Sequence, residues 1–257
     1  MEIGLFVKNE VVPTSLVDEL VKKIKSLGHS YNNENPEIVF TIGGDGTFLK
    51  AVHFYLKKLE DITFVCLNKG KLGYFSDFKV EDFEDVLKSF TSDKFKINEM
   101  RLVKAEFDNE EIYAVNEIRI ENPFHTLTCE VYVNGDYLET FRGNGLVVST
   151  SSGSSAYNKS LGGAVIDNSL ELLELNEIAP INNRLYSSLH SPLIVSGDSL
   201  ITFKGDISTS VLGYDHLVKK DYKSEEISFS LTNKKVSVLS KKETSFINKI
   251  NKAFISK

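Results

Sequence analysis

The amino-acid sequence predicts a mixed α/β protein in which an α/β region is followed by a mostly antiparallel β region. Up to about residue 96, short apolar runs alternate with amphipathic stretches, which is typical of βαβ units around a parallel sheet. Beyond that point the hydrophobic pattern changes to a period of two residues, which predicts strands with two different faces. The chain has 257 residues, enough for two domains that each bury a core.

The first region should alternate strands and helices. The apolar run IGLFV (residues 3–7) predicts a buried strand, and leucines and an isoleucine at helical spacing predict a helix over residues 16–27. Two more strands are expected at residues 37–42 and 62–68, with a helix that begins at Thr47 between them. This order predicts a parallel sheet.

The second region should consist mainly of antiparallel strands. Alternating apolar residues predict strands at residues 95–107, 112–120, 129–141 and 145–150. The dipeptide Asn134-Gly135 inside the third of these is a strong signal for a hairpin turn. We expect an α/β domain of residues 1–96, a β-rich domain of residues 97–232, and a last segment, 233–257, that rejoins the first domain.

Composition excludes several classes of protein. The formal net charge is −6 and no block of consecutive Lys and Arg is present, so we expect no nucleic-acid partner. No apolar run approaches the length of a membrane span, and the N-terminal apolar stretch is too short for a signal peptide, so we expect a cytoplasmic protein without membrane contacts. Cys66 and Cys129 lack a metal-ligand spacing, and we expect two buried, reduced thiols and no protein-bound metal.

A glycine-rich turn, Gly43-Gly44-Asp45-Gly46-Thr47, connects a buried strand to the predicted helix. Glycines let a ligand approach the main chain, and N–H groups at the start of a helix attract phosphate. The turn lacks the Lys of the P-loop and the third glycine of the dinucleotide fingerprint. Taken alone, it is equally well a plain strand-to-helix connection in which Asp45 is the N-cap.

The carboxylate of Asp45 has a chemical use in this place. A phosphate repels a neighbouring carboxylate, so an acid beside a phosphate-binding turn is costly unless it contacts a hydroxyl or a cation. In phosphoryl transfer, an Asp near the acceptor hydroxyl takes its proton late in the step. The turn therefore indicates a kinase, with Asp45 as a candidate base.

Two further stretches indicate a bound nucleotide. In YAVNEIRI, Asn116 and Glu117 place an amide beside a carboxylate, a pair that can hydrogen-bond to the neighbouring hydroxyls of a sugar. An edge strand with one solvent-exposed face is the simpler explanation. The stretch FRGNGLVVSTSSGSSAYNKSLGGAVI is bracketed by apolar runs, unlike a flexible linker. Its hydroxyls, freed N–H groups and Tyr157 can hold a base and a ribose. No G-x-S-x-G elbow is present, which argues against a serine hydrolase.

The motifs together resemble the bacterial NAD kinase family. GGDGT also occurs in diacylglycerol and sphingosine kinases and, in a related form, in phosphofructokinases. NAD kinases in addition carry stretches similar to NKGKLGYFSDF, VNE, the Ser-rich block with NKSLGGA, and NEIAPINNRLYSSLHSPLIV, in this order. The resemblance extends from Ile38 to about Val195, and the Ser-rich block is its most specific part.

The resemblance implies an N-terminal Rossmann-like α/β domain and a C-terminal β-sandwich domain that binds NAD. It implies transfer of a phosphoryl group from ATP or polyphosphate to the 2′-hydroxyl of the adenosine ribose of NAD, which produces NADP. Asp45 would be the general base and Gly46 would contact the dinucleotide, while Asn116 and Glu117 would bind the region of the nicotinamide-side ribose. The other implied NAD contacts are Arg142, Asn144, Ser155, Ala156, Tyr157, Asn158, Lys159, Ser160 and Ala179. The implied phosphate-donor loop is Gly43, Gly44, Gly46 and Thr47.

The resemblance also implies Mg²⁺ bound with the phosphate donor. It implies a homo-oligomer, a tetramer, in which Arg142, Asn144 and Ala179 reach the site partly from a neighbouring subunit. The family usually has Asp where this chain has Asn144, which puts that contact in doubt because an amide can also donate. Thr150 to Tyr157 keep the hydroxyls of the family's T-P-T-G-S-T-A-Y but lose its proline.

Two alternatives stay open at the level of sequence. The chain could be a lipid or sugar kinase that shares only the glycine-rich turn, or a non-catalytic dinucleotide sensor in which Asp45 merely caps a helix. Tyr74 and Phe75 either border the substrate pocket or belong to the core.

Overall fold

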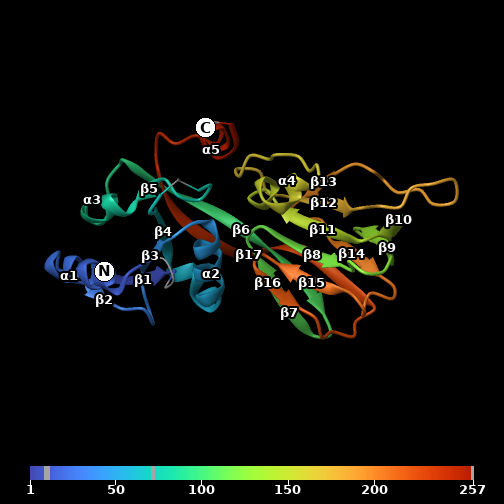
Figure 1. Ribbon diagram of the computed structural model, residues 1–257, viewed down its shortest axis with the longest axis horizontal. Helices are drawn as coiled ribbons and strands as arrows, with labels where there is room; N and C mark the ends of the chain where they lie inside the picture. Colours follow the sequence, from blue (N-terminus) through green and yellow to red (C-terminus); the bar gives the residue numbers. More distant parts are fainter. Residues whose placement is uncertain (9–11, 71–72, 256–257) are drawn as a thin grey trace. The chain divides into compact units, whose positions relative to one another are not determined.

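The computed structural model shows two compact units, and each is described on its own (Figure 1). The structure describes residues 1–8, 12–70 and 73–255. Within these, the first unit comprises residues 1–99 and 234–255, and the second comprises residues 100–233. Two long strands, β6 (Phe95–Phe107) and β17 (Glu226–Lys241), carry the chain from one unit to the other.

The first unit is built on a parallel sheet. Its own strands are β1 (Glu2–Val7), β2 (Ser30–Tyr31), β3 (Ile38–Ile42), β4 (Thr63–Asn68) and β5 (Phe78–Lys79). The order β4-β3-β1-β2 is parallel throughout, and the outer edge of β4 pairs in parallel with β5 at one end and with β17 at the other. This sheet is the one that the alternating pattern predicted.

Helices cover both faces of the parallel sheet. The helices of this unit are α1 (Thr14–Ser26), α2 (Asp45–Phe54), α3 (Phe83–Lys88) and α5 (Phe246–Ile250), with 3-10 turns η1 (Leu56–Asp61) and η2 (Val80–Asp82) and a π-helical turn η4 (Asn251–Ile255). On one face, Ile24 of α1 and Phe83 of α3 join the same buried cluster as Phe40 of β3. On the other face, the ring of Phe48 in α2 lies 5.7 Å from that of Phe64 in β4. The arrangement is the α/β domain expected at the N-terminus.

The second unit is a sandwich of two β-sheets (Figure 1). Its remaining strands are β7 (Glu110–Ala114), β8 (Glu117–Glu121), β9 (Leu127–Val133), β10 (Asp136–Gly143), β11 (Gly145–Thr150), β12 (Leu172–Ile178), β13 (Leu193–Ser196), β14 (Ile201–Lys204), β15 (Val211–Tyr214) and β16 (Leu217–Lys219). One sheet has the order β13-β12-β11-β8-β15-β16, and the other joins β10-β9-β14-β17 to β6 and β7. Side chains from both sheets, such as Val148 and Phe203, share one buried cluster.

Local signals in the second unit were partly confirmed. Asn134 and Gly135 both have positive φ and form the turn between β9 and β10, as predicted. The single strand expected at residues 112–120 is wrong, because the chain leaves one sheet after Ala114 and enters the other at Glu117. The alternation of apolar residues continues through this crossing, so the pattern did not reveal it.

The last helical turns, residues 246–255, belong to the first unit, and their apolar residues are not buried. No residue of α5 or η4 is buried, and Ile247 and Phe254 are 69% and 43% exposed. A polar contact joins the segment to the unit instead, since Lys249 Nζ lies 4.0 Å from a carboxylate oxygen of Asp77. The last two residues of the predicted segment 233–257 lie outside the described residues.

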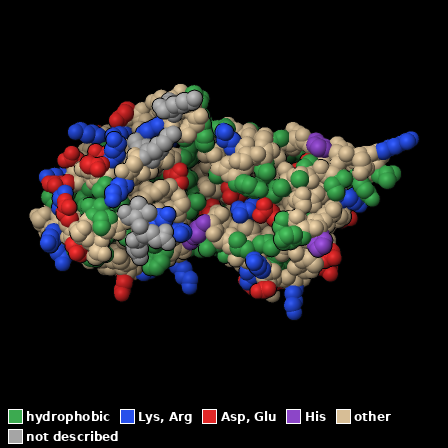
Figure 2. All heavy atoms as spheres, in the orientation of Figure 1, with side chains coloured by type: hydrophobic (Ala, Val, Ile, Leu, Met, Phe, Trp, Pro, Cys, Tyr) green, Lys and Arg blue, Asp and Glu red, His purple; other side chains and the backbone are tan. Residues whose placement is uncertain are grey.

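The remaining general expectations concern thiols and surface. Cys66 and Cys129 are both buried and free, as predicted. On the face of each unit seen in Figure 2, acidic and basic side chains are interspersed. Within the described ranges, every helix is too short or too polar to span a membrane.

Candidate functional site

In the first unit, the carboxylate of Asp45 is held by a loop of the same unit. Gly44 is the N-cap of α2 and Asp45 is its first residue, so the helix begins two residues earlier than predicted. The Oδ2 atom of Asp45 accepts a hydrogen bond from the N–H of Tyr74 at 2.9 Å, and Oδ1 accepts one from Phe75 at 3.1 Å. The interpretation of Asp45 as a helix cap is therefore wrong.

The loop that begins at Gly73 is shaped around this carboxylate. A Cβ atom at Gly73 would lie 2.3 Å from Oδ1 of Asp45, far inside contact distance. The side chains of Tyr74 and Phe75 are only 7% and 5% exposed, and the Phe75 ring lies 4.6 Å from that of Phe48. Of the two roles open for these aromatic residues, the structure favours the core, while their backbone N–H groups contact Asp45.

The glycine-rich turn leaves its main chain open. A Cβ atom at Gly44 or Gly46 would meet no other atom within 4 Å, and both residues are exposed. Gly43 differs, because its φ is +155° and a Cβ atom there would lie 2.2 Å from Oγ1 of Thr47. Thr47 is buried over Gly43, so the accessible part of the predicted phosphate-donor loop is the backbone around Gly44 and Gly46.

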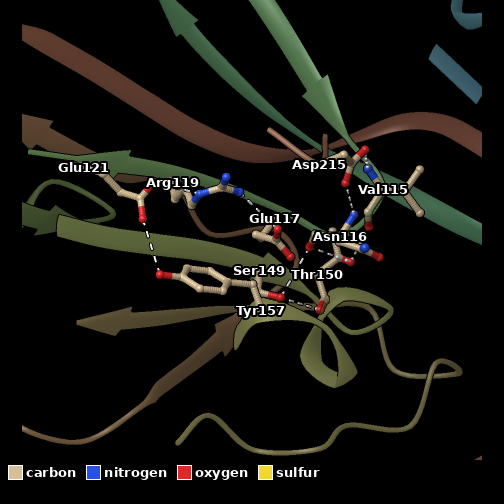
Figure 3. Close-up of polar contacts among 9 residues, drawn as sticks. All are labelled: Val115, Asn116, Glu117, Arg119, Glu121, Ser149, Thr150, Tyr157 and Asp215. Atoms are coloured by element: carbon tan, nitrogen blue, oxygen red, sulfur yellow. Dashed lines mark hydrogen bonds and ion pairs between the residues drawn. The ribbon is translucent and has the colours of Figure 1, made fainter. Parts of the chain in front are cut away.

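In the second unit, the main chain of Asn116 is fixed from two sides (Figure 3). Its N–H donates to Oδ1 of Asp215 at 2.8 Å, and its carbonyl accepts the N–H of Thr150 at 2.9 Å. Oγ of Ser149 also donates to this carbonyl, at 3.3 Å. A Cβ atom at Gly153 would lie 1.9 Å from the same oxygen, so the Ser-rich turn packs directly on Asn116.

The side chains of Asn116 and Glu117 keep unused hydrogen-bonding atoms. Oδ1 of Asn116 and Oε2 of Glu117 are buried, and neither has a hydrogen-bond partner within the described part of the chain. Burial raises the pKa of Glu117 to about 7, helped by the negative charge of Asp215 and opposed by Arg119. Near neutral pH this carboxyl can therefore donate or accept a hydrogen bond. Unsatisfied buried polar atoms are rare in folded proteins, so these two oxygens are candidates for contact with a ligand.

Three charged residues lie in a row on the same face of β8. Arg119 lies between two acids, with Nη1 3.4 Å from Oε1 of Glu117 and Nε 2.9 Å from Oε2 of Glu121. The guanidinium lies 5.3 Å from the ring centre of Tyr157, whose hydroxyl donates to Oε1 of Glu121 at 3.3 Å (Figure 3). Tyr157 is 37% exposed, which leaves ring surface for stacking.

The Ser-rich turn is a rigid, hydrogen-bonded structure. Ser149, Thr150, Ser151, Ser152 and Ser154 are all buried. The hydroxyls of Ser149, Thr150, Ser151 and Ser154 bond to the main chain, for example Oγ of Ser154 to the carbonyl of Ser151 at 2.6 Å. The turn continues through η3 (Gly153–Ser155) into α4 (Tyr157–Ser160). The expectation that this block is not a flexible linker is confirmed.

Residues of the predicted NAD block differ in accessibility. Ser155 and Ala156 are partly exposed, and Lys159 and Ser160 are exposed. Asn158 is completely buried, and its Oδ1 lies 3.5 Å from Nδ2 of Asn176. Asn158 therefore lies inside the turn, and its contact with NAD stays a prediction.

Arg142, Asn144 and Ala179 lie at another end of the second unit. Asn144 immediately precedes β11, and Thr150 at the end of that strand is bonded to Asn116; six strand residues span about 20 Å. The side chain of Asn144 donates from Nδ2 to the carbonyl of Asn122 at 3.1 Å, and the Arg142 guanidinium lies 4.4 Å from the ring centre of Tyr186. One copy of the unit does not bring Asn144 together with Asn116.

Several residues around these sites were missed from sequence. They are Gly73, Arg119, Glu121 and Asp215. Arg119 and Glu121 follow Glu117 at intervals of two, so the period of a strand was a usable signal. The period of the apolar residues gave no role to Gly73, which lies within the NKGKLGYFSDF motif, or to Asp215, because their partners are remote in the chain.

The donor groups suit a metal that arrives with a phosphate ligand. In the described ranges, no three His, Cys, Asp or Glu residues are placed to hold a metal ion together. Mg²⁺ is commonly bound by one or two carboxylates together with substrate phosphates, and does not need a cage made entirely of protein ligands. Asp45 beside an open glycine turn fits that kind of binding.

Comparison with protein families matches both parts of the chain. Residues 9–95 match the ATP-NAD kinase N-terminal domain, and residues 115–239 match the ATP-NAD kinase C-terminal domain. The NAD kinase of Limosilactobacillus reuteri is 34% identical, with 99% of this chain and 98% of that protein covered. NAD kinase 1 of Oceanobacillus iheyensis is also 34% identical, with 93% and 96% covered.

Solved structures agree on the fold. Yeast NADH kinase complexed with NADH has a TM-score of 0.84 at 19% identity, covering 100% of this chain and 88% of that chain. An NAD kinase from Archaeoglobus fulgidus in complex with ATP has a TM-score of 0.80 at 21% identity, covering 98% and 99%. At these identities the likeness concerns the fold.

Proposed function

This chain belongs to the NAD kinase family, and from this premise we propose that it transfers a phosphoryl group from ATP to the 2′-hydroxyl of the adenosine ribose of NAD, producing NADP. One observation supports the proposal above others. The carboxylate of Asp45 is held by two backbone N–H groups of a loop, next to a turn whose main chain is open at Gly44 and Gly46. A carboxylate positioned in this way is suited to chemistry on a hydroxyl.

Asp45 acts as the general base in this proposal. Each carboxylate oxygen accepts one N–H bond and keeps a lone pair that can face the acceptor hydroxyl. The oxygen of the 2′-hydroxyl attacks the terminal phosphorus of ATP, the bond to ADP breaks, and the hydroxyl proton passes to Asp45 late in the step. A positioned base contributes about 10²- to 10⁴-fold to the rate.

The second unit binds the dinucleotide in this proposal. The buried oxygens of Asn116 and Glu117 serve a ribose diol, since an amide and a carboxyl near its pKa together offer donors and acceptors. Ser155, Ala156, Tyr157, Lys159 and Ser160 supply the exposed side of the nucleotide site, with the Tyr157 ring as the stacking surface.

The phosphate donor brings Mg²⁺ in this proposal. The metal neutralises charge on the transferred phosphoryl group when bound. The backbone N–H groups at Gly44 and Gly46 contribute to binding the donor phosphates, because the start of α2 favours negative charge. Polyphosphate is a second possible donor, since this turn would recognise phosphate and not a base.

We also propose a cytoplasmic homo-oligomer, a tetramer. Arg142, Asn144 and Ala179 lie at a different end of the second unit from Asn116, which favours their contribution to the site of a neighbouring copy. The segment after Ala179 exposes several large apolar side chains, and a group of them favours a contact with another chain; they are Ile181, Leu185, Tyr186 and Leu189. Two free buried thiols agree with a reducing compartment.

The test is an assay of purified protein with Mg²⁺, a phosphate donor and an acceptor, read as NADP formed. We expect NADP from ATP and NAD, and a loss of about 10²-fold or more in kcat for Asp45→Asn with NAD binding retained. Asp85→Asn, in the first turn of α3, is the matched control and should be unchanged. Equal rates for Asp45→Asn and wild type would remove the base assignment.

The choice of substrates distinguishes the alternatives. Phosphorylation of a lipid or sugar without phosphorylation of NAD would show a different kinase that shares the glycine-rich turn. Binding of NAD without phosphorylation by ATP or polyphosphate would show a dinucleotide sensor. Including NADH as acceptor and polyphosphate as donor defines the substrate range.

A further inference from the structure

The chain crosses between the two sheets of the second unit at Val115 and Asn116. β7 ends at Ala114 and pairs with β6, whereas β8 begins at Glu117 and pairs with β11 and β15. Both crossing residues are buried, so their N–H groups need partners other than a neighbouring strand.

A single side chain supplies both partners. Oδ2 of Asp215 accepts the N–H of Val115 at 2.9 Å, and Oδ1 accepts the N–H of Asn116 at 2.8 Å. The backbone N–H of Asp215 also donates to the carbonyl of Glu117 at 3.2 Å. Three consecutive residues are thus bonded to one residue about a hundred positions away (Figure 3).

An Asp at position 215 would be unfavourable without specific contacts. It lies in the two-residue connection between β15 and β16, with φ +48° and only 8% exposure. A left-handed backbone favours glycine, and a buried carboxylate is costly unless it is hydrogen-bonded. The two N–H bonds to Val115 and Asn116 offset that cost.

The crossing is held on its opposite side by the Ser-rich turn. Thr150 Oγ1 donates to the carbonyl of Val115 at 2.7 Å, and the N–H of Thr150 donates to that of Asn116. With both ends of the Asn116 peptide bonded, its side chain and that of Glu117 are left with the buried, unpartnered oxygens described above.

We propose that Asp215 is a positioning residue for the dinucleotide: its carboxylate fixes the backbone at residues 115–117 so that Asn116 and Glu117 present their free oxygens to the ribose. Asp215 itself does not contact the substrate in this proposal. The inference rests on the proposed function, because it assigns NAD to Asn116 and Glu117.

The charge of Asp215 gives the proposal a measurable signature. The charged groups that act on Glu117 are Asp215 from the β15–β16 connection and Arg119 and Glu121 from β8, while the Tyr157 hydroxyl of α4 bonds to Glu121. Removing the negative charge at residue 215 should lower the pKa of Glu117, because that charge helps to raise it. This shift reports that Asp215 acts on Glu117, and the separate KM values for NAD and ATP distinguish positioning of the site from general stability.

The experiment compares Asp215→Ala and Asp215→Asn with wild type in steady-state kinetics from pH 5.5 to pH 9. For Asp215→Ala we expect the KM for NAD to rise about tenfold or more, with the KM for ATP within about twofold, because a buried N–H pair loses its acceptors. Asp215→Asn keeps one acceptor and should recover part of the NAD affinity. It should also move the limb of the kcat/KM profile near pH 7 to lower pH by about half a unit or more.

The matched control is Asp108→Asn. Asp108 also has a left-handed backbone and accepts a remote N–H, that of Lys223 at 2.8 Å, but it is exposed in the turn between β6 and β7 and is not one of the site residues. We expect its KM and pH profile to equal those of wild type. Thermal unfolding of each variant shows whether it is folded. If Asp215→Ala does not fold, the test is made with Asp215→Asn alone.

The proposal is overturned if folded Asp215→Asn has the KM for NAD and the pH profile of wild type. It is also overturned if the KM values for NAD and ATP rise equally, since that indicates general loss of structure. If wild type forms no NADP with any donor, the proposed function itself fails. If wild type is active and the variants behave as wild type does, only the role of Asp215 fails.

Discussion

A Cβ atom on Gly73 would lie 2.3 Å from Oδ1 of Asp45, so the loop and the carboxylate fit together only while residue 73 has no side chain. We expect Gly73→Ala to displace Asp45 and lower kcat about 10²-fold, since misplacing a reacting group by about 1 Å has effects of this size. Gly70→Ala is the control, because a Cβ atom there meets nothing within 4 Å. Equal kcat values for the two variants would show that Asp45 tolerates movement.

Tyr157 should contribute through its ring more than through its hydroxyl. We expect Tyr157→Ala to raise the KM for NAD by about tenfold, because stacking of a base on an aromatic ring contributes roughly 1–3 kcal/mol. Tyr157→Phe keeps the ring and loses a 3.3 Å hydrogen bond at a partly exposed site, so its KM should stay within about threefold. The same kinetic assay measures both, and a larger effect for Tyr157→Phe would reverse the assignment.

Asn144 should not tolerate the Asp that is usual in the family. Its Nδ2 donates to the carbonyl of Asn122 at 3.1 Å, and a carboxylate cannot donate this bond. We expect Asn144→Asp to lower the free energy of unfolding by about 1 kcal/mol, measured by urea denaturation. Asn183→Asp is the control, since the side-chain oxygen of Asn183 only accepts from Leu185 and Tyr186. An unchanged Asn144→Asp would mean that the amide is not needed as a donor.

Glu139 should make stability fall as pH rises. Burial, together with the charge of Glu177, raises the pKa of Glu139 from 4.5 to about 7. Between these values the unfolded chain has lost the proton and the folded chain keeps it. The contribution of this group to stability is therefore greatest below pH 4.5 and is lost as the pH rises towards 7.

We therefore expect Glu139→Gln to gain stability over wild type between pH 5 and pH 8. The difference in free energy of unfolding between the variant and wild type should increase by about 1–2 kcal/mol over this range. Urea unfolding at both pH values measures the difference, with Glu60→Gln at an exposed position as control. Parallel behaviour of Glu139→Gln and wild type would contradict the assignment.

Local patterns in the sequence predicted the elements that local physics determines. The period of the apolar residues located α1 and the strands β1, β3 and β4, and Asn134-Gly135 located a hairpin because both residues accept a left-handed backbone. The family resemblance added the β-sandwich.

Features that depend on residues remote in the sequence could not be predicted from local patterns. The crossing at Val115 and Asn116 depends on Asp215, and the alternation of apolar residues runs through it unchanged. The start of α2 was misplaced because an Asp after glycines resembles an N-cap, whereas its carboxylate is occupied by Tyr74 and Phe75. Burial of Asn158 was likewise not visible in a Ser-rich, polar stretch. The assignments of substrate contacts stay predictions.

The long strand β17 has a consequence for the order in which the protein folds during synthesis. β4 pairs with Ser237 and Val238 of β17, whereas every residue of the second unit lies between positions 100 and 233. The ribosome therefore completes the second unit before the first has received its last strand, although nascent chains generally fold from the N-terminal domain onward. We expect residues 1–99 to remain with the outer edge of β4 unpaired at Thr63 and Phe64, and so open to wrong pairing, until residue 238 emerges from the ribosome.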